Sequence, residues 1–104
     1  MRKTVLMLTV RTKPGKRDEL RAVWDEHLRP RAEGNVAQEL YVYCYDAQDP
    51  DVIHMIEVYG DPEEMQRNAE APWFAEYMRV AAPLIAGPPR MVTAEPKWAK
   101  GYAL

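Results

Sequence analysis

The 104-residue sequence is poor in the residues that build metal sites and disulfides. It has one cysteine, Cys44, and two histidines, so it offers neither an intramolecular disulfide nor a ligand spacing typical of zinc or iron. A lone thiol suits a reducing compartment, and we expect a cytoplasmic protein. The formal net charge is −2, so no basic excess attracts nucleic acid. No apolar run approaches the roughly 20 residues that span a bilayer, and we expect no membrane association.

The composition that remains is that of one globular domain covering residues 1–104. Hydrophobic residues make up 47% and charged residues 29% of the chain, which is ordinary globular usage. The apolar stretch after Met1 could be mistaken for a secretion signal. It runs into Arg11 and Lys13 without a cleavage pattern, so a buried strand is the better interpretation.

The periodicity predicts the element order β-α-β-β-α-β. Strands are expected over residues 3–12, 40–45, 52–59 and 90–95. One amphipathic helix runs from Lys16 until Pro30 disrupts it. The second helix is broken, with starts at Asp61-Pro62 and Ala71-Pro72, and Gly87-Pro88-Pro89 ends it. This order predicts a ferredoxin-like α+β fold, with two helices over one face of a four-stranded antiparallel sheet.

Both faces of the predicted sheet are largely apolar, which indicates that its second face is also covered. In the first strand, Val5 and Met7 alternate with Leu6 and Leu8. A second copy of the chain is the expected cover, giving a homodimer. The apolar tail, residues 96–104, is expected to pack on the partner. Three tyrosines share one face of the second strand, and the sequence leaves open whether that face lines a pocket or the dimer interface: Tyr41, Tyr43 and Tyr45.

The chain resembles the antibiotic biosynthesis monooxygenase (ABM) domain of the dimeric α+β barrel superfamily. The resemblance rests on four stretches: 13–19 (KPGKRDE), Asp49-Pro50, 53–59 with Glu57, and 71–74 (APWF). It implies a cofactor-independent oxidation of an electron-rich aromatic, such as a quinol, anthrone or related polyphenol, by molecular oxygen. A ligand-binding dimer without chemistry, or an isomerase or cyclase using the same pocket, are the alternatives. Haem cleavage is not expected, because Met78 stands where haem degraders carry histidine.

The resemblance also suggests which side chains form the site. It implies a pocket between the helices and the sheet, with His27, Tyr77 and Arg90 as catalytic candidates. The expected substrate-binding residues are Asn68, Trp73, Trp24 and Tyr43. Trp73 stands where many quinol monooxygenases carry histidine.

Each candidate also has a structural interpretation. Trp73 and Tyr77, one helical turn apart, could be core residues, and His27 a partly buried histidine. Arg90 could be a solvated surface residue. We expect His54 to be structural, on the dimer face. Glu57 is expected to be a structural carboxylate bonded to a neighbouring strand or to the partner, and not a catalytic base.

Overall fold

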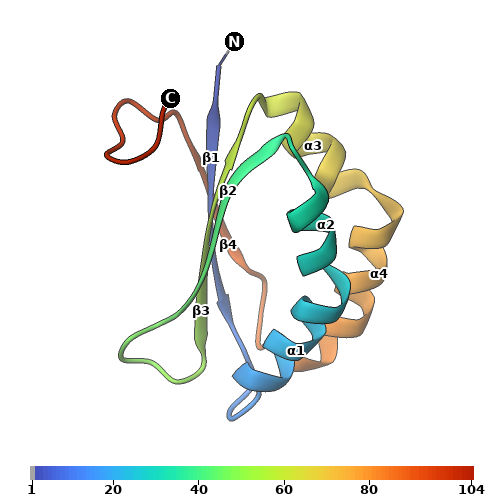
Figure 1. The fold of residues 1–104 in the computed structure, drawn as a ribbon. Helices are drawn as coiled ribbons and strands as arrows, with labels where there is room; N and C mark the ends of the chain where they lie inside the picture. Colours follow the sequence, from blue (N-terminus) through green and yellow to red (C-terminus); the bar gives the residue numbers. More distant parts are fainter. Residues whose placement is uncertain (1) are drawn as a thin grey trace.

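The computed structural model describes residues 2–104, and its four helices lie on one face of a four-stranded antiparallel sheet (Figure 1). The predicted element order is confirmed. The strands are β1 (Thr4–Arg11), β2 (Gln38–Tyr45), β3 (Val52–Tyr59) and β4 (Arg90–Ala94), and they lie in the order β2-β3-β1-β4. The helices are α1 (Arg17–His27), α2 (Arg29–Gly34), α3 (Pro62–Glu70) and α4 (Pro72–Ala81).

Proline positions explain the two places where the predicted helices differ from the observed ones. The first helix ends before Pro30, as predicted, but Pro30 also occupies the first turn of a further short helix, α2, where a missing N–H costs nothing. The last helix ends earlier than expected, at Ala81. Pro83 then lies in a single 3₁₀ turn, Ala82–Leu84, since proline cannot continue an α-helical hydrogen-bond ladder.

Asp61 caps the start of α3, but only one of the two hydrogen bonds of a capping box is present. The Asp61 side chain accepts a hydrogen bond of 2.8 Å from the backbone N–H of Glu64, as an N-cap should. The reciprocal bond of a capping box is not made. The Glu64 carboxylate pairs instead with Arg67, one turn further along the helix.

The strand register decides which face of β2 carries the tyrosines. Tyr41 lies opposite Glu57, and Tyr43 lies opposite Met55, on the neighbouring strand β3. Met55 belongs to the core cluster beneath the helices, together with Leu20, Trp24 and Tyr77. The three tyrosines therefore face the helix layer, and the question left open by the sequence is settled.

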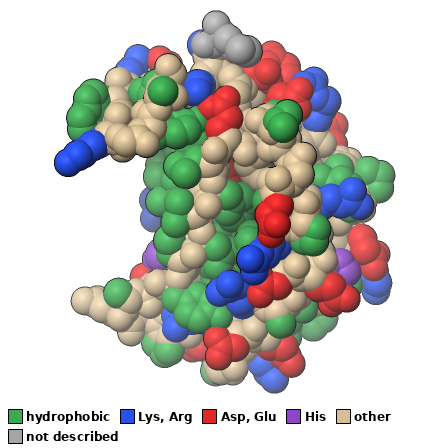
Figure 2. Space-filling view, viewed as in Figure 1, with side chains coloured by type: hydrophobic (Ala, Val, Ile, Leu, Met, Phe, Trp, Pro, Cys, Tyr) green, Lys and Arg blue, Asp and Glu red, His purple; other side chains and the backbone are tan. Residues whose placement is uncertain are grey.

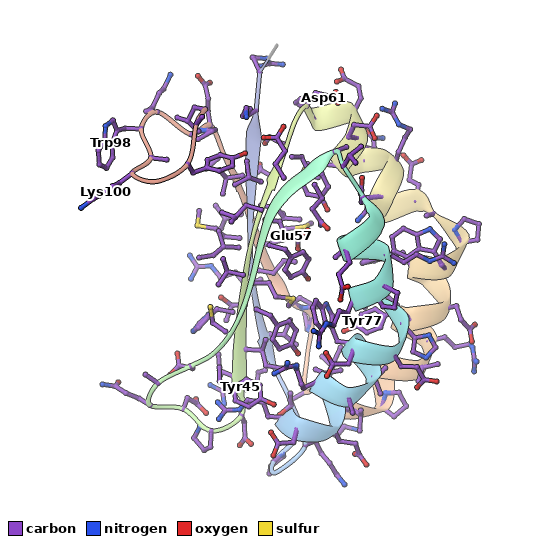
Figure 3. The ribbon with its side chains drawn as sticks, in the orientation of Figure 1. Tyr45, Glu57, Asp61, Tyr77, Trp98 and Lys100 are labelled. Carbon is purple, nitrogen blue, oxygen red and sulfur yellow. The ribbon has the colours of Figure 1, made fainter. Side chains whose placement is uncertain are left out.

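The opposite face of the sheet is apolar and uncovered in the single chain. Met7, Val42, Ile56 and Val92 are each about 40% exposed on neighbouring positions of the four strands. Figure 2 views the sheet edge-on and shows hydrophobic side chains along the side that faces away from the helices. The tail lies at one end of it and leaves Trp98 79% exposed (Figure 3).

The tail is held to its own chain by a small polar cluster. Lys3 forms an ion pair of 2.6 Å with Glu39, and its ammonium donates to the backbone oxygen of Ala103. The Tyr102 hydroxyl also donates to Glu39. No helix within residues 2–104 is long and apolar enough to cross a membrane.

Candidate functional site

A cavity of about 90 Å³ lies between the helix-facing side of the sheet and the four helices. Its wall is mainly aromatic and aliphatic. Tyr41 and Tyr43 come from β2, Met55 and Glu57 from β3, Asn68 from α3, and Trp73, Phe74, Tyr77 and Met78 from α4. An apolar wall with a few polar groups is the usual form of a small-molecule site.

Glu57 gives this cavity its polar inner wall. Its side chain is 4% exposed and is held by neighbours in the sheet: Gln38 Nε2 donates to Oε1 at 2.8 Å, and the Tyr59 hydroxyl donates to Oε1 at 2.7 Å. The expected bond to a neighbouring strand is confirmed, since Gln38 belongs to β2. This carboxylate also lines the cavity, which no sequence signal indicated (Figure 3).

Only one of the two Glu57 oxygens is occupied by these bonds. No hydrogen bond from residues 2–104 reaches Oε2. Every fully buried side-chain polar atom among these residues has a hydrogen-bond partner, so Oε2 is not fully buried. Since Glu57 lines the cavity, Oε2 has access to it. Burial raises the pKa of Glu57, and the bonds from Tyr59 and Gln38 and the nearby Tyr41 hydroxyl only partly offset it. A carboxylate with a raised pKa is a stronger proton acceptor than an exposed one.

Asn68 extends the polar wall as a positioning residue. Its Nδ2 donates to the Tyr59 hydroxyl at 3.1 Å, and its Oδ1 accepts from Asn35 Nδ2 at 3.4 Å. The chain of bonds from Asn35 through Asn68 and Tyr59 ends on Glu57. Asn68 thus fixes the hydroxyl that fixes the carboxylate, and it lines the cavity as expected.

Two tyrosines of the cavity wall have hydroxyls without a protein partner among residues 2–104. Tyr77 and Tyr43 both line the cavity, and neither hydroxyl makes a hydrogen bond to a described residue. Burial raises the pKa of Tyr77 to about 12 and also raises that of Tyr43. Both groups are therefore protonated at neutral pH and can donate a hydrogen bond to a ligand. Figure 3 shows Tyr77 extending from α4 toward the sheet.

Three of the expected site residues lie outside the cavity wall. Trp24 is buried behind it, 4.5 Å from Tyr43 between ring centroids, and its Nε1 donates to the Tyr41 hydroxyl. His27 lies in an outer depression, with its ring centroid 6.5 Å from that of Tyr77. Arg90, a catalytic candidate from the sequence, does not line the cavity. Arg90 is exposed at the start of β4, in register with Thr9 on the uncovered face of the sheet.

The structure adds Arg31 of α2 to the site. Arg31 lines both the cavity and the outer depression, as does Trp73, and its guanidinium carbon lies 5.3 Å from the Trp73 ring centroid. No sequence signal pointed to this residue, because the short helix that carries it, α2, was not predicted. Figure 2 shows basic and acidic side chains at the edge of the hollow between sheet and helices.

A family model described as "Antibiotic biosynthesis monooxygenase" matches residues 4–80, which include every cavity residue named above. The chain belongs to the antibiotic biosynthesis monooxygenase family. The resemblance carried by the sequence motifs is therefore confirmed. Among curated proteins, none is significantly similar in sequence.

Solved structures share the fold of this ABM chain over nearly its whole length. A protein of Chloroflexus aurantiacus, provisionally named an antibiotic biosynthesis monooxygenase, has 27% identity and a TM-score of 0.79, covering 95% of this chain and 97% of its own. A Caulobacter crescentus protein with the same provisional name has 14% identity and a TM-score of 0.85, covering 93% and 92%. A Nitrosomonas europaea protein of unknown function has 23% identity and a TM-score of 0.81, covering 99% and 97%. These neighbours support the ferredoxin-like α+β fold.

Proposed function

We propose that this ABM protein is a cofactor-independent monooxygenase that oxidises an electron-rich aromatic, a quinol or an anthrone, with molecular oxygen. One observation carries the proposal: an aromatic-walled cavity has a buried carboxylate, Glu57, at its inner wall. Aromatic walls suit a flat substrate, and the carboxylate supplies a proton acceptor. An electron-rich carbanion or phenolate can itself reduce oxygen, so the protein needs only to bind, deprotonate and stabilise negative charge.

The proposed reaction balances at a substrate CH₂ carbon of the anthrone type. Glu57 Oε2 takes one proton, and the carbanion passes one electron to O₂, giving a substrate radical and superoxide. These join in a C–O bond, and the proton held by Glu57 completes a hydroperoxide. Loss of the second C–H proton breaks the O–O bond, leaving a carbonyl and one water. Carbon loses two hydrogens, one oxygen atom stays on carbon, and the other leaves as water.

The hydroxyls of Tyr77 and Tyr43 would stabilise the negative charge on the substrate oxygen. Both tyrosines line the cavity, no described residue hydrogen-bonds to either hydroxyl, and their raised pKa values keep them protonated. Trp73 and Phe74 would provide flat contact surface. Asn68 acts through Tyr59 and is a positioning residue.

A fused-ring substrate requires the cavity wall to move. The volume of about 90 Å³ is below the roughly 150 Å³ of an engineered cavity that holds benzene. Met55 and Met78 line the cavity, and their unbranched side chains adapt at low cost. The outer depression beyond Arg31 and Trp73 provides a further 480 Å³ or so once that pair separates.

The homodimer is part of the same proposal. The uncovered face of the sheet bears Met7, Val42, Ile56 and Val92, and a second copy would remove these side chains from water. We also propose a cytoplasmic location, where the free Cys44 thiol is stable.

Oxygen uptake by chelator-treated protein tests the proposal across a panel of hydroquinones and anthrones. Uptake above the buffer rate, lowered on the order of a hundredfold by Glu57→Gln, is the expected result. Glu63→Gln, on the exposed side of α3, is the matched control and should retain activity. Saturable binding without uptake would favour the ligand-binding alternative. Product formation without oxygen consumption would favour an isomerase or cyclase.

A further inference from the structure

Arg31 and Trp73 form the boundary between the cavity and the outer depression. Both side chains line both spaces. Glu57, by contrast, is 4% exposed and belongs to the inner wall. Among the described residues that line the cavity, Arg31 and Glu57 carry the only formal charges. A ligand in the cavity would therefore meet a cation at the mouth and a carboxylate inside.

The Arg31 guanidinium is free to bind an anion. It forms no ion pair within residues 2–104, although the carboxylates of Glu26 and Glu76 share its depression. Glu76 pairs with Arg79 instead. The neighbouring arginines of α1 and α2 differ in this respect, since Arg21 pairs with Asp25, and Arg29 pairs with Asp25 and Glu33.

The contact with Trp73 leaves the donors of Arg31 available. The guanidinium carbon lies 5.3 Å from the Trp73 ring centroid, within cation–π range. Such a contact does not use the N–H edge of the group, which matches the two oxygens of a carboxylate in a bidentate pair. Glu57 would repel the same carboxylate at the inner wall, so the two charges together would orient a ligand.

We propose that Arg31 selects hydroxyaromatic ligands that carry a carboxylate, with the carboxylate at the mouth and the hydroxyl directed toward Glu57. The aromatic class of the ligand rests on the proposed function, but the selection by charge does not require turnover. It is therefore tested by equilibrium binding measured in the absence of oxygen.

The experiment compares 6-hydroxy-2-naphthoate, whose two groups lie at opposite ends of the ring system, with its neutral isostere 6-hydroxy-2-naphthamide by isothermal titration calorimetry. We expect the wild-type protein to bind the naphthoate about tenfold more tightly. Arg31→Gln should bind both compounds equally, with naphthamide affinity within about twofold of wild type. Arg31→Lys should keep part of the preference. Added salt should weaken the naphthoate alone.

Arg29→Gln is the matched control, because it removes the same charge from the same helix away from the cavity. It should leave the preference intact. Equal affinities in the wild-type protein, a preference that survives Arg31→Gln, or no binding of either compound would each overturn the inference. A preference lost in Arg31→Gln alone would support it even if no quinol drives oxygen uptake, in which case only the proposed oxidation fails.

Discussion

Tyr59 donates a hydrogen bond of 2.7 Å to Glu57, two residues earlier on the same face of β3. Gln38 donates to the same carboxylate oxygen, Oε1, from the adjacent strand. The two bonds fix the carboxylate in one orientation and leave Oε2 toward the cavity. A buried acid that is held at one oxygen and open at the other combines a structural with a chemical role.

The raised pKa of Glu57 makes stability depend on pH. Its folded pKa lies above the ordinary value of 4.5, so the folded state holds this proton more tightly than the unfolded state. That contribution to stability is complete below pH 4.5 and is lost as the pH rises through the folded pKa. Glu57→Gln removes it. The free energy of unfolding of the variant, relative to wild type, should therefore increase between pH 4 and pH 7.

Urea denaturation at the two pH values measures this difference. Glu63→Gln is the control, because Glu63 is exposed on α3 and its difference from wild type should stay within about 0.5 kcal/mol at both pH values. A Glu57→Gln difference that does not change with pH would contradict the burial of an unfavourable charge.

Tyr77→Phe should lower turnover without destabilising the fold. The hydroxyl makes no hydrogen bond to a described residue, so its removal leaves no buried protein group unpaired. Loss of one donor to a developing negative charge should cost on the order of tenfold or more in kcat. Tyr45→Phe is the matched control, since the Tyr45 hydroxyl donates to Asp18 outside the cavity. Equal turnover in both variants would rule out a role for the Tyr77 hydroxyl.

His27→Ala should leave turnover within about twofold of wild type, because the imidazole lies in the outer depression and not in the cavity. The sequence alone suggested a catalytic role for this residue. Steady-state oxygen uptake with the best quinol of the panel distinguishes the two views. A tenfold loss at unchanged melting temperature would restore the catalytic role.

Ile56→Lys should dissociate the proposed dimer. Ile56 is 38% exposed and lies between Met7 and Val42 on the uncovered face, where a charge would be buried by a second copy. Sedimentation equilibrium should give twice 12.0 kDa for the wild-type protein and 12.0 kDa for the variant. Val36→Lys, at a position 95% exposed and away from this face, should remain a dimer. A monomeric wild-type protein at micromolar concentration would contradict the prediction.

Trp98→Ala should weaken the dimer about tenfold, as expected for a large aromatic side chain at an interface. Trp98 is 79% exposed at the end of the uncovered face, so most of its ring faces solvent in a single chain. Truncation after Pro96 should act in the same direction. A dissociation constant unchanged in both variants would show that the tail does not touch a partner.

Local signals determined most of the fold. Alternating apolar residues gave the strands, and Pro14-Gly15, Asp61-Pro62 and Ala71-Pro72 gave the turn and two helix starts, because these residues restrict the backbone wherever they occur. The sequence analysis predicted only one of the two effects of Pro30. Pro30 ends the first helix, as expected, and it also stands in the first turn of another helix.

The site depended far more on tertiary structure. The spacing of Trp73 and Tyr77 placed both on one helix face, and both line the cavity, because helical periodicity is a local property. The side of the sheet on which Tyr43 and Arg90 lie depends on strand register, and a shift of one residue exchanges the two sides.

The charged groups of the site are positioned by contacts between distant segments. Arg31 reaches the cavity because α2 lies against Trp73 of α4. The Glu57 oxygen Oε2 is accessible from the cavity because Gln38 and Tyr59 bind only the other oxygen, Oε1. Composition and periodicity therefore determined the elements and their apolar faces, whereas the positions of the charged groups followed from long-range pairing that no local pattern encodes.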